Sequence, residues 1–273
     1  MIDGYENFTY NETDENKAKY NIHTHNYLCG HAVGTVEDYV KEAVKNNFVC
    51  IGISDHIGQP HMDNPYVKYR DLDDKYLSQI RYAERLYGDK ITILAGGETE
   101  YLEENDELYK KLNEKLDYLI LGQHSFKFND EYVSSFFDCD TEERVLEYIR
   151  QVNAGLLSHY FKVLAHPDLF FRSGVEVTPE IKAAFTDMII TANKNDVLVE
   201  LNANGMRSQG CCYPSDLLID ACKDNDITVI VSSDCHSPEK LNDEAFKKLL
   251  HFAQSKNLKI ATTDEVLKRI RNS

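Results

Sequence analysis

No uncharged apolar run in the sequence approaches the roughly 20 residues that a membrane-spanning helix needs. A secretory signal would be basic and then apolar, whereas the N-terminus, MIDGYENFTYNETDENK, is acidic. We therefore expect a cytoplasmic protein without a membrane partner.

The cysteines form no C-x-x-C pair, are odd in number and accompany no export signal. This pattern argues against a disulfide framework or a thiolate zinc cluster, so we expect reduced thiols. Two of them stand beside candidate metal-binding histidines, but we interpret them as small apolar packing residues. These two are Cys29 and Cys235.

Positive charge is scarce, with 30 lysines and arginines against 46 acidic residues and a formal net charge of −16. Such a surface repels polyanions, so we expect no nucleic-acid partner. A small anionic substrate fits this charge only if the site itself is locally positive.

No Gly/Ser linker, repeat or long block of one charge sign divides the chain. Its 273 residues and 42% hydrophobic content suffice for a sizeable core. We expect one domain over residues 18–273, preceded by a polar N-terminal extension over residues 1–17.

Short apolar runs alternate with amphipathic segments along the chain. The runs are almost continuously apolar, as in parallel strands buried on both faces. Seven such units predict an α/β barrel of TIM type, or a variant lacking one strand, and an open doubly wound sheet is the competing fold. The predicted strands cover residues 20–25, 49–54, 91–97, 118–123, 162–166, 197–202 and 227–233.

Polar residues mark the starts of three predicted helices. Thr35 is placed to cap a helix with one continuous apolar face. Asp140 can cap a second helix, and Ser237 followed by Pro238 opens a third.

Side chains that bind metals stand at the C-terminal end of nearly every predicted strand. In a barrel these ends converge on one mouth, whereas an open sheet would spread them along a line. His23 and His25 lie two apart on a strand, so both face one side and can reach one ion. The strand-end set is His23, His25, Asp55, His56, Glu98, His124, His166, Asp234 and His236.

With His31 added, seven histidines stand beside the carboxylates Glu98 and Asp234. These nine ligands exceed what one ion can use, because first-row metals take roughly four to six donors including water. Two or three ions are therefore implied. Imidazole with a minority of carboxylate suits Zn, Mn or Fe better than Ca or Mg.

Several ordered motifs resemble the PHP (polymerase and histidinol phosphatase) metallophosphoesterases, and within them the histidinol-phosphate phosphatases. The resemblance spans residues 20 to about 240 and implies a distorted (β/α)7 barrel with a trinuclear metal centre. The motifs are H-T-H with C-G-H-A, S-D-H, G-G-E, G-Q-H-S, A-H-P-D, E-L-N-A-N-G-M-R and S-S-D-C-H.

The resemblance also implies how nine residues divide among three divalent ions. One ion would be held by His23, His25, Glu98 and Asp234, and a second by Glu98, His124 and His166. The third would be held by His31, His56 and His236. Glu98 would thus bridge two ions.

The function implied by the resemblance is hydrolysis of L-histidinol phosphate to L-histidinol and phosphate, in histidine biosynthesis. We expect a hydroxide that bridges the metals held by Glu98 to attack phosphorus in line, and we count Glu98 and Asp234 among the catalytic residues. Arg172 and Arg207 follow predicted strands and are expected to bind the phosphate oxygens as catalytic residues. Asp55 and Asp168 are expected to orient histidine rings or to protonate the leaving alcohol.

The loops 57–71 and 125–139 are expected on the same face as the metal ligands. Their aromatic residues suggest closure over an imidazole-bearing alcohol, with core packing as the alternative. These residues are Tyr66, Tyr69, Phe126 and Phe128.

Three rival functions use similar residues. A PHP-type nucleotide phosphatase or oligonucleotide exonuclease would share the metal centre, but the net charge of −16 weighs against it. An amidohydrolase also begins with H-x-H, yet no strand carries the lysine that would bridge its metals. A non-catalytic metal sensor would bind metal without turnover.

Overall fold

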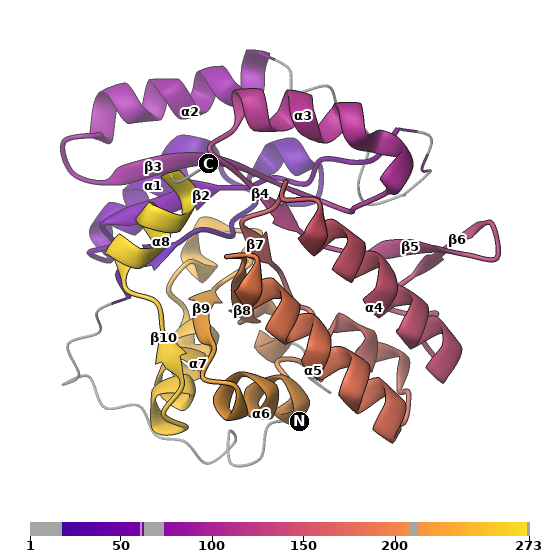
Figure 1. Ribbon diagram of the computed structural model, residues 1–273. Coiled ribbons are helices and arrows are strands. Elements are labelled where there is room, and N and C mark those ends of the chain that lie inside the picture. The colour runs from indigo at the N-terminus through magenta and orange to yellow at the C-terminus, as the bar shows by residue number, and fades with distance from the viewer. Residues whose placement is uncertain (1–17, 61, 63–73, 208–211, 272–273) are drawn as a thin grey trace.

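A computed structural model describes residues 18–60, 62, 74–207 and 212–271, and its main feature is one curled parallel sheet of eight strands. Figure 1 shows these strands in the middle of the molecule with helices around them. In sheet order the strands are β1 (Tyr20–Asn21), β2 (Cys50–Ile53), β3 (Thr92–Thr99), β4 (Tyr118–Leu121), β7 (Val163–Leu164), β8 (Leu198–Asn202), β9 (Thr228–Ser232) and β10 (Lys259–Ile260).

A helix follows each strand of this sheet before the next strand of the same sheet begins. This is the alternation that the sequence predicts. Parallel neighbours require such crossovers, and the helices cover the sheet. The helices are α1 (Val36–Lys45), α2 (Asp74–Tyr87), α3 (Asp106–Lys115), α4 (Glu142–Leu157), α5 (Pro179–Lys194), α6 (Asp216–Asp224), α7 (Glu244–Ser255) and α8 (Thr263–Arg271). Among the described residues, no helix is long and apolar enough to cross a membrane.

All seven predicted strands coincide with strands of the sheet. The α/β class with a curled parallel sheet is confirmed, but the count of seven units is not, because β10 adds an eighth strand beside β9. This strand has only two residues, one of them exposed, so it lacks the apolar run that marks the others. Residues 1–17, the predicted extension, lie outside the described residues.

The curl of the sheet brings β1 and β9 together near their C-terminal ends. Thr24 and Cys235 form a parallel bridge just beyond β1 and β9, and the His25 amide donates to the Cys235 carbonyl at 3.0 Å. Inside the curl, the Tyr118 hydroxyl donates to the Ile22 carbonyl at 2.6 Å. A Cβ at Gly52 would lie 1.9 Å from that hydroxyl, so the glycine makes room for the ring.

The predicted helix starts differ in outcome. Thr35 caps α1 with a full capping box, in which its side chain and that of Asp38 each accept from the other's backbone amide. The cap of α4 is Thr141 rather than Asp140, because the Thr141 hydroxyl reaches the amide of Arg144. Ser237 precedes only a short 3-10 helix, and α7 begins later, where the Asp243 carboxylate accepts from the Phe246 amide.

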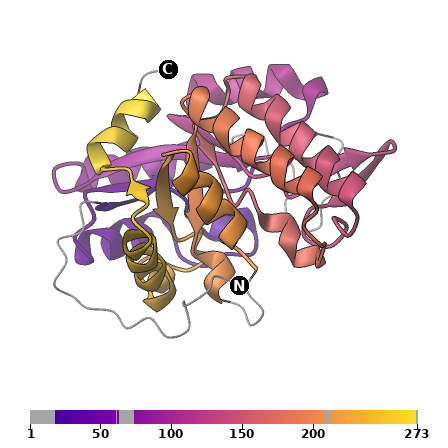
Figure 2. The ribbon, with the colours of Figure 1, turned by 60° about the horizontal axis from the view of Figure 1, so that its bottom comes forward.

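A two-stranded antiparallel hairpin, β5 (Ser125–Phe128) and β6 (Glu131–Ser134), leaves the main sheet after β4. It projects beside α4 in Figure 1. Figure 2 shows α4 and α5 side by side, and these two helices pack against each other. One strand of the hairpin, β5, thus lies against α4, a helix of this packed pair.

Candidate metal centre

The centre begins where β2 and β3 end. Their parallel pairing continues one step further, because His56 bridges Glu98 and the Ile57 amide donates to the Glu98 carbonyl at 2.7 Å. The Glu98 amide in turn donates to the Asp55 carbonyl at 3.1 Å. These backbone bonds hold His56 and Glu98 side by side.

Five imidazoles surround the buried Glu98 carboxylate, and they divide between its two oxygens. Each ring nitrogen lies close enough for a shared ion or a hydrogen bond. Near Oε2 are His56 Nδ1 at 2.8 Å, His23 Nε2 at 3.3 Å and His25 Nε2 at 3.5 Å, and near Oε1 are His166 Nε2 at 2.9 Å and His124 Nε2 at 3.4 Å.

Asp234 provides the second carboxylate of the cluster. Its Oδ1 lies 3.1 Å from His25 Nε2 and 3.7 Å from His23 Nε2. His236 Nδ1 is 3.8 Å from the same oxygen, and His236 Nε2 is 3.0 Å from Nε2 of the exposed His31. The chain thus brings together all nine residues predicted to bind metal.

Two of these residues have strained backbones. His166 and Asp234, at the ends of β7 and β9, have φ angles of +29° and +46°. Residues other than glycine rarely adopt these values, and each such residue costs on the order of 1–3 kcal/mol. The surrounding fold maintains both conformations, which aim the two side chains at the cluster.

The polar atoms of the cluster fit divalent metal ions. Buried polar atoms are normally hydrogen-bonded, yet several here have no hydrogen-bond partner within the described part of the chain. They include His23 Nε2, both ring nitrogens of His25, and Glu98 Oε2. Neutral imidazole nitrogens and carboxylate oxygens are donors to Zn, Mn and Fe.

The groupings of these atoms agree partly with the arrangement that the sequence suggests. Three ligand atoms lie within 4.8 Å of one another in His23, His25 and Glu98, as expected for the first ion. His56 lies in such a group with Glu98 and His124, and in another with His25 and His236. The His56 ring thus lies within reach of Glu98 and His124 as well as of His236, its expected partner at the third ion.

Charges within the cluster shift its pKa values strongly. Burial opposes ionisation of Glu98, but the surrounding histidines, His23 first, hold its carboxyl pKa well below the usual range. Burial lowers the pKa of His56 to about 4, which favours the neutral imidazole that binds metal. Burial also disfavours charge on His124, yet Glu98 and Glu100 raise the pKa of this ring to about 9.

The sequence analysis missed the buried Glu200 on β8. Its Oε1 lies 2.7 Å from His23 Nδ1, and its Oε2 accepts from the His166 amide at 3.0 Å. Asn202, two residues further along the strand, donates to Glu200 at 2.8 Å and to Asp234 at 3.1 Å. Residues two apart on a strand share a face, so the E-L-N motif already indicated that Glu200 and Asn202 point to the same side of the sheet.

Asp55 and Asp168, expected beside histidine rings, both accept backbone hydrogen bonds. Asp55 Oδ1 accepts from the Asn26 amide at 2.6 Å, and Asp168 Oδ2 from the Ser215 amide at 2.5 Å. Both carboxylates are buried, and burial raises the Asp168 pKa to about 6. These bonds tie the loops after β1 and β8 to the strand ends that carry the cluster.

The two predicted phosphate-binding arginines differ in their surroundings. A cavity of about 770 Å³ lies over the cluster, and the exposed Arg172 lines it together with Lys240. Arg207 donates to both carboxylate oxygens of Asp243, at 2.8 and 3.2 Å, and to the Ser233 carbonyl at 2.5 Å. Arg207 is therefore extensively bonded within the protein, whereas Arg172 faces the cavity.

Among the residues that the structure describes, the aromatic side chains at the cavity differ from those expected from the sequence. Phe126 is fully buried in the core against Tyr148, and Tyr66 and Tyr69 lie outside the described residues. Phe136 and Phe137, just after the hairpin, line the cavity instead.

Comparisons with known proteins agree with these features. The profile of the PHP domain matches residues 20–204, more than half of the 273-residue chain. A Schizosaccharomyces pombe protein described as "Probable histidinol-phosphatase" is 26% identical over 254 residues, covering 80% of this chain and 81% of that protein. A Deinococcus radiodurans protein with the same description is 24% identical over 225 residues, covering 79% and 85%.

A solved structure shares the fold. The histidinol phosphate phosphatase of Lactococcus lactis, solved with zinc, L-histidinol and phosphate, superposes with a TM-score of 0.71. It is 14% identical, and the match covers 88% of this chain and 94% of that one. The profile match and the clustered histidines lead to one conclusion: the chain belongs to the PHP-domain family.

Proposed function

We propose that this protein is a metal-dependent phosphomonoesterase that hydrolyses L-histidinol phosphate to L-histidinol and phosphate. The observation that carries the proposal is the Glu98 carboxylate, with five imidazoles around it, beneath a cavity lined by Arg172. The S. pombe and D. radiodurans relatives support the choice of substrate through their descriptions. So does the L. lactis enzyme, which was solved with L-histidinol and phosphate.

The proposed cofactors are three divalent ions, drawn from Zn, Mn and Fe. When bound, such ions neutralise phosphoryl oxygens and lower the pKa of water toward neutrality. His23, His25, Glu98 and Asp234 would hold the first ion. The second would be held by Glu98, His124 and His166, and the third by His31, His56 and His236.

The chain's own residues have separate proposed tasks. Arg172 binds the phosphate oxygens at the mouth of the cavity, where a guanidinium can form two parallel hydrogen bonds. Arg207 is retained as a second proposed phosphate ligand, although its bonds to Asp243 already use much of its donor capacity. Glu98 and Asp234 balance part of the cationic charge of the centre, which leaves an excess that attracts a phosphate dianion.

The proposed domain is a distorted (β/α)7 barrel over residues 18–273, with residues 1–17 as an extension. Support comes from the Thr24–Cys235 bridge, which joins the ends of β1 and β9. In this view β10 is an addition beside β9 rather than an eighth barrel unit.

The test is phosphate release by the metal-replete protein from histidinol phosphate, nucleotides and sugar phosphates, compared as kcat/KM. We expect a preference of about 100-fold or more for histidinol phosphate, as a pocket that binds polar substrate groups can achieve. Higher turnover of nucleotides or oligonucleotides would support the alternative PHP function and reject this substrate. Metal uptake with no turnover would indicate a sensor.

A histidine variant tests the centre itself. We expect His25→Ala to abolish turnover and to lower the bound metal measured by elemental analysis, because its ring lies near both Glu98 and Asp234. His159→Asn is the matched control, since His159 is exposed and its φ of +63° is one that asparagine tolerates. Full activity in His25→Ala would remove this residue from the mechanism.

A further inference from the structure

Arg172 is held at the cavity by aromatic rings. Its Cζ lies 5.1 Å from the centroid of the Phe136 ring and 6.0 Å from that of Phe137. Within the described part of the chain, no carboxylate pairs with Arg172. Its charge is therefore available to an anion, in contrast to that of Arg207, which Asp243 neutralises.

The two phenylalanines are fixed by the turn that follows β6. The Ser134 amide donates to Asp138 Oδ2 at 2.7 Å, and the Asp138 amide donates back to the Ser134 carbonyl at 2.9 Å. The Cys139 amide donates to the Ser173 hydroxyl at 3.1 Å, which joins this turn to the segment that carries Arg172. The turn and the segment of the arginine are thus connected by this hydrogen bond as well as by the rings.

The same turn also contacts the histidine cluster. The Phe136 ring is stacked on the His124 ring, with 5.7 Å between centroids and 8° between planes. The Ser135 amide donates to the His124 carbonyl at 2.8 Å. Phe136 therefore lies between a candidate metal ligand and the cation at the cavity mouth.

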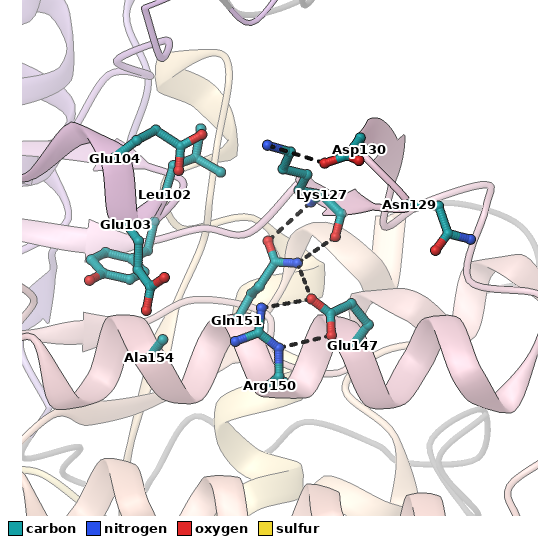
Figure 3. A pocket seen from close by; sticks show the side chains of 11 residues that line it. Leu102, Glu103, Glu104, Lys127, Asn129, Asp130, Glu147, Arg150, Gln151 and Ala154 are labelled. Atoms are coloured by element: carbon teal, nitrogen blue, oxygen red, sulfur yellow. Dashed lines mark hydrogen bonds and ion pairs between the residues drawn. The ribbon is translucent and has the colours of Figure 1, made fainter.

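The hairpin that leads into the turn is anchored on its opposite side, at a second cavity of about 390 Å³. Figure 3 shows Gln151 of α4 between the hairpin and Glu147. Gln151 Oε1 accepts from the Lys127 amide at 3.0 Å, and its Nε2 donates to the Lys127 carbonyl at 2.6 Å and to Glu147 at 2.7 Å. The Gln151 amide thus forms the two backbone hydrogen bonds that a neighbouring strand would form with β5. These bonds fix the position of β5 relative to α4.

Phe137 is exposed over 67% of its surface, which is unusual for a phenylalanine fixed in an ordered turn. A cation above an aromatic face is attracted to the negative face of the ring, and more strongly when a ligand displaces water. The contact also limits the rotamers of a long arginine side chain before substrate arrives, which reduces the entropy lost on binding.

We propose that Phe136 and Phe137 are positioning residues that hold the Arg172 guanidinium over the cavity for the phosphate group of the substrate. The inference rests on the proposed phosphomonoesterase function. It assigns the turn after β6 to phosphate binding. Other residues would then recognise the alcohol part of the substrate.

The experiment is a double-mutant cycle on the metal-replete protein, with Phe137→Leu, Arg172→Ala and the combination. The readouts are competitive inhibition by inorganic phosphate, kcat and KM, and the increase in Tm that inorganic phosphate produces without turnover. We expect Phe137→Leu to weaken phosphate binding about two- to five-fold with little change in kcat. In the Arg172→Ala background, Phe137→Leu should have no further effect.

Conservative and remote variants complete the design. Phe137→Tyr should bind phosphate like the original protein, because tyrosine keeps an aromatic face. Tyr82→Leu is the matched control, since Arg85 lies 5.7 Å over the half-exposed Tyr82 ring on α2, far along the chain from the turn. It should leave phosphate binding unchanged. For Phe136→Leu the bound metal is measured as well as phosphate binding, because Phe136 also stacks on His124.

Two results would overturn the inference. One is unchanged phosphate binding in Phe137→Leu, and the other is an equal loss in the presence and absence of Arg172. Failure of the proposed function would look different: the protein would not hydrolyse histidinol phosphate, yet the Tm response to phosphate would still report whether Phe137 and Arg172 act together.

Discussion

The Nδ1 atom of His23 lies 2.7 Å from Oε1 of Glu200, and both side chains are fully buried. The Glu200 carboxylate can accept only if His23 carries a proton on Nδ1. In the neutral ring this leaves Nε2, which lies near Glu98 and Asp234, with the lone pair. A carboxylate thus selects the tautomer that binds metal.

Glu200→Gln should lower metal affinity about 10- to 100-fold, because an amide is a weaker acceptor and can present its NH2 group to the ring. Competition with a coloured chelator on the metal-free protein measures the affinity. Glu103→Gln, at an exposed residue, is the control. An unchanged dissociation constant in Glu200→Gln would show that His23 needs no partner to select its tautomer.

Gly122→Ala should displace the carboxylate at the middle of the cluster. A Cβ at Gly122 would lie 2.1 Å from Glu98 Oε1, a distance that real structures do not tolerate. Since histidines surround Glu98, the carboxylate has little room to move, and we expect loss of bound metal by elemental analysis together with loss of turnover. Gly174→Ala is the control, because its Cβ would meet nothing within 4 Å. That variant should lose about 1 kcal/mol of stability from backbone strain but keep its metal.

The two arginines should differ in how much each contributes to the stability of the fold. Arg207→Ala removes bonds to Asp243 and to the Ser233 and Lys240 carbonyls, so we expect a loss of about 2–3 kcal/mol in the free energy of unfolding. Arg172→Ala removes an exposed side chain and should cost less than about 0.5 kcal/mol while raising KM. Urea unfolding and steady-state kinetics measure the two effects. Equal stability losses would contradict the distinction.

Asp168 should make the metal-free protein less stable as pH rises. Burial raises the pKa of its carboxyl to about 6 from an ordinary value of 3.8, so the folded state holds the proton more tightly than the unfolded state. The contribution of Asp168 to the free energy of unfolding is complete at pH values below its unfolded pKa. It is lost as pH rises through about 6, by an amount on the order of 3 kcal/mol. Asp168→Asn keeps an acceptor for the Ser215 amide but cannot ionise. Urea unfolding at pH 4 and pH 8 should show a smaller decrease for this variant, and parallel decreases would exclude Asp168 as the cause.

Much of the cluster of histidines and carboxylates was predictable from local sequence. Apolar runs define the strands, and parallel strands with crossover helices place their C-terminal ends at one side. His23, His25, Glu98 and Asp234 could therefore be expected together without knowledge of distances. The helix cap at Thr35 was predictable for the same reason, because it depends only on the side chains of Thr35 and Asp38, three residues apart.

Other features depend on contacts between distant segments. Asp243 pairs with Arg207 across 36 residues, and this pairing changes the interpretation of an arginine that sequence alone places at the mouth. The contacts of Phe136 with His124 and Arg172 depend on how the segment after the hairpin is placed at the cavity. The hydrophobic periodicity of the sequence does not predict this placement.

The sequence by itself determined the α/β class, the positions of seven strands and the identity of the clustered ligands, because strand and helix periodicity and polar strand ends are local properties. The tertiary structure alone decided the eighth strand, the partner of His23, and which arginine faces the cavity without a carboxylate beside it. These depend on which groups meet in three dimensions, and the energy of a buried or charged group is determined by those neighbours rather than by its position in the chain.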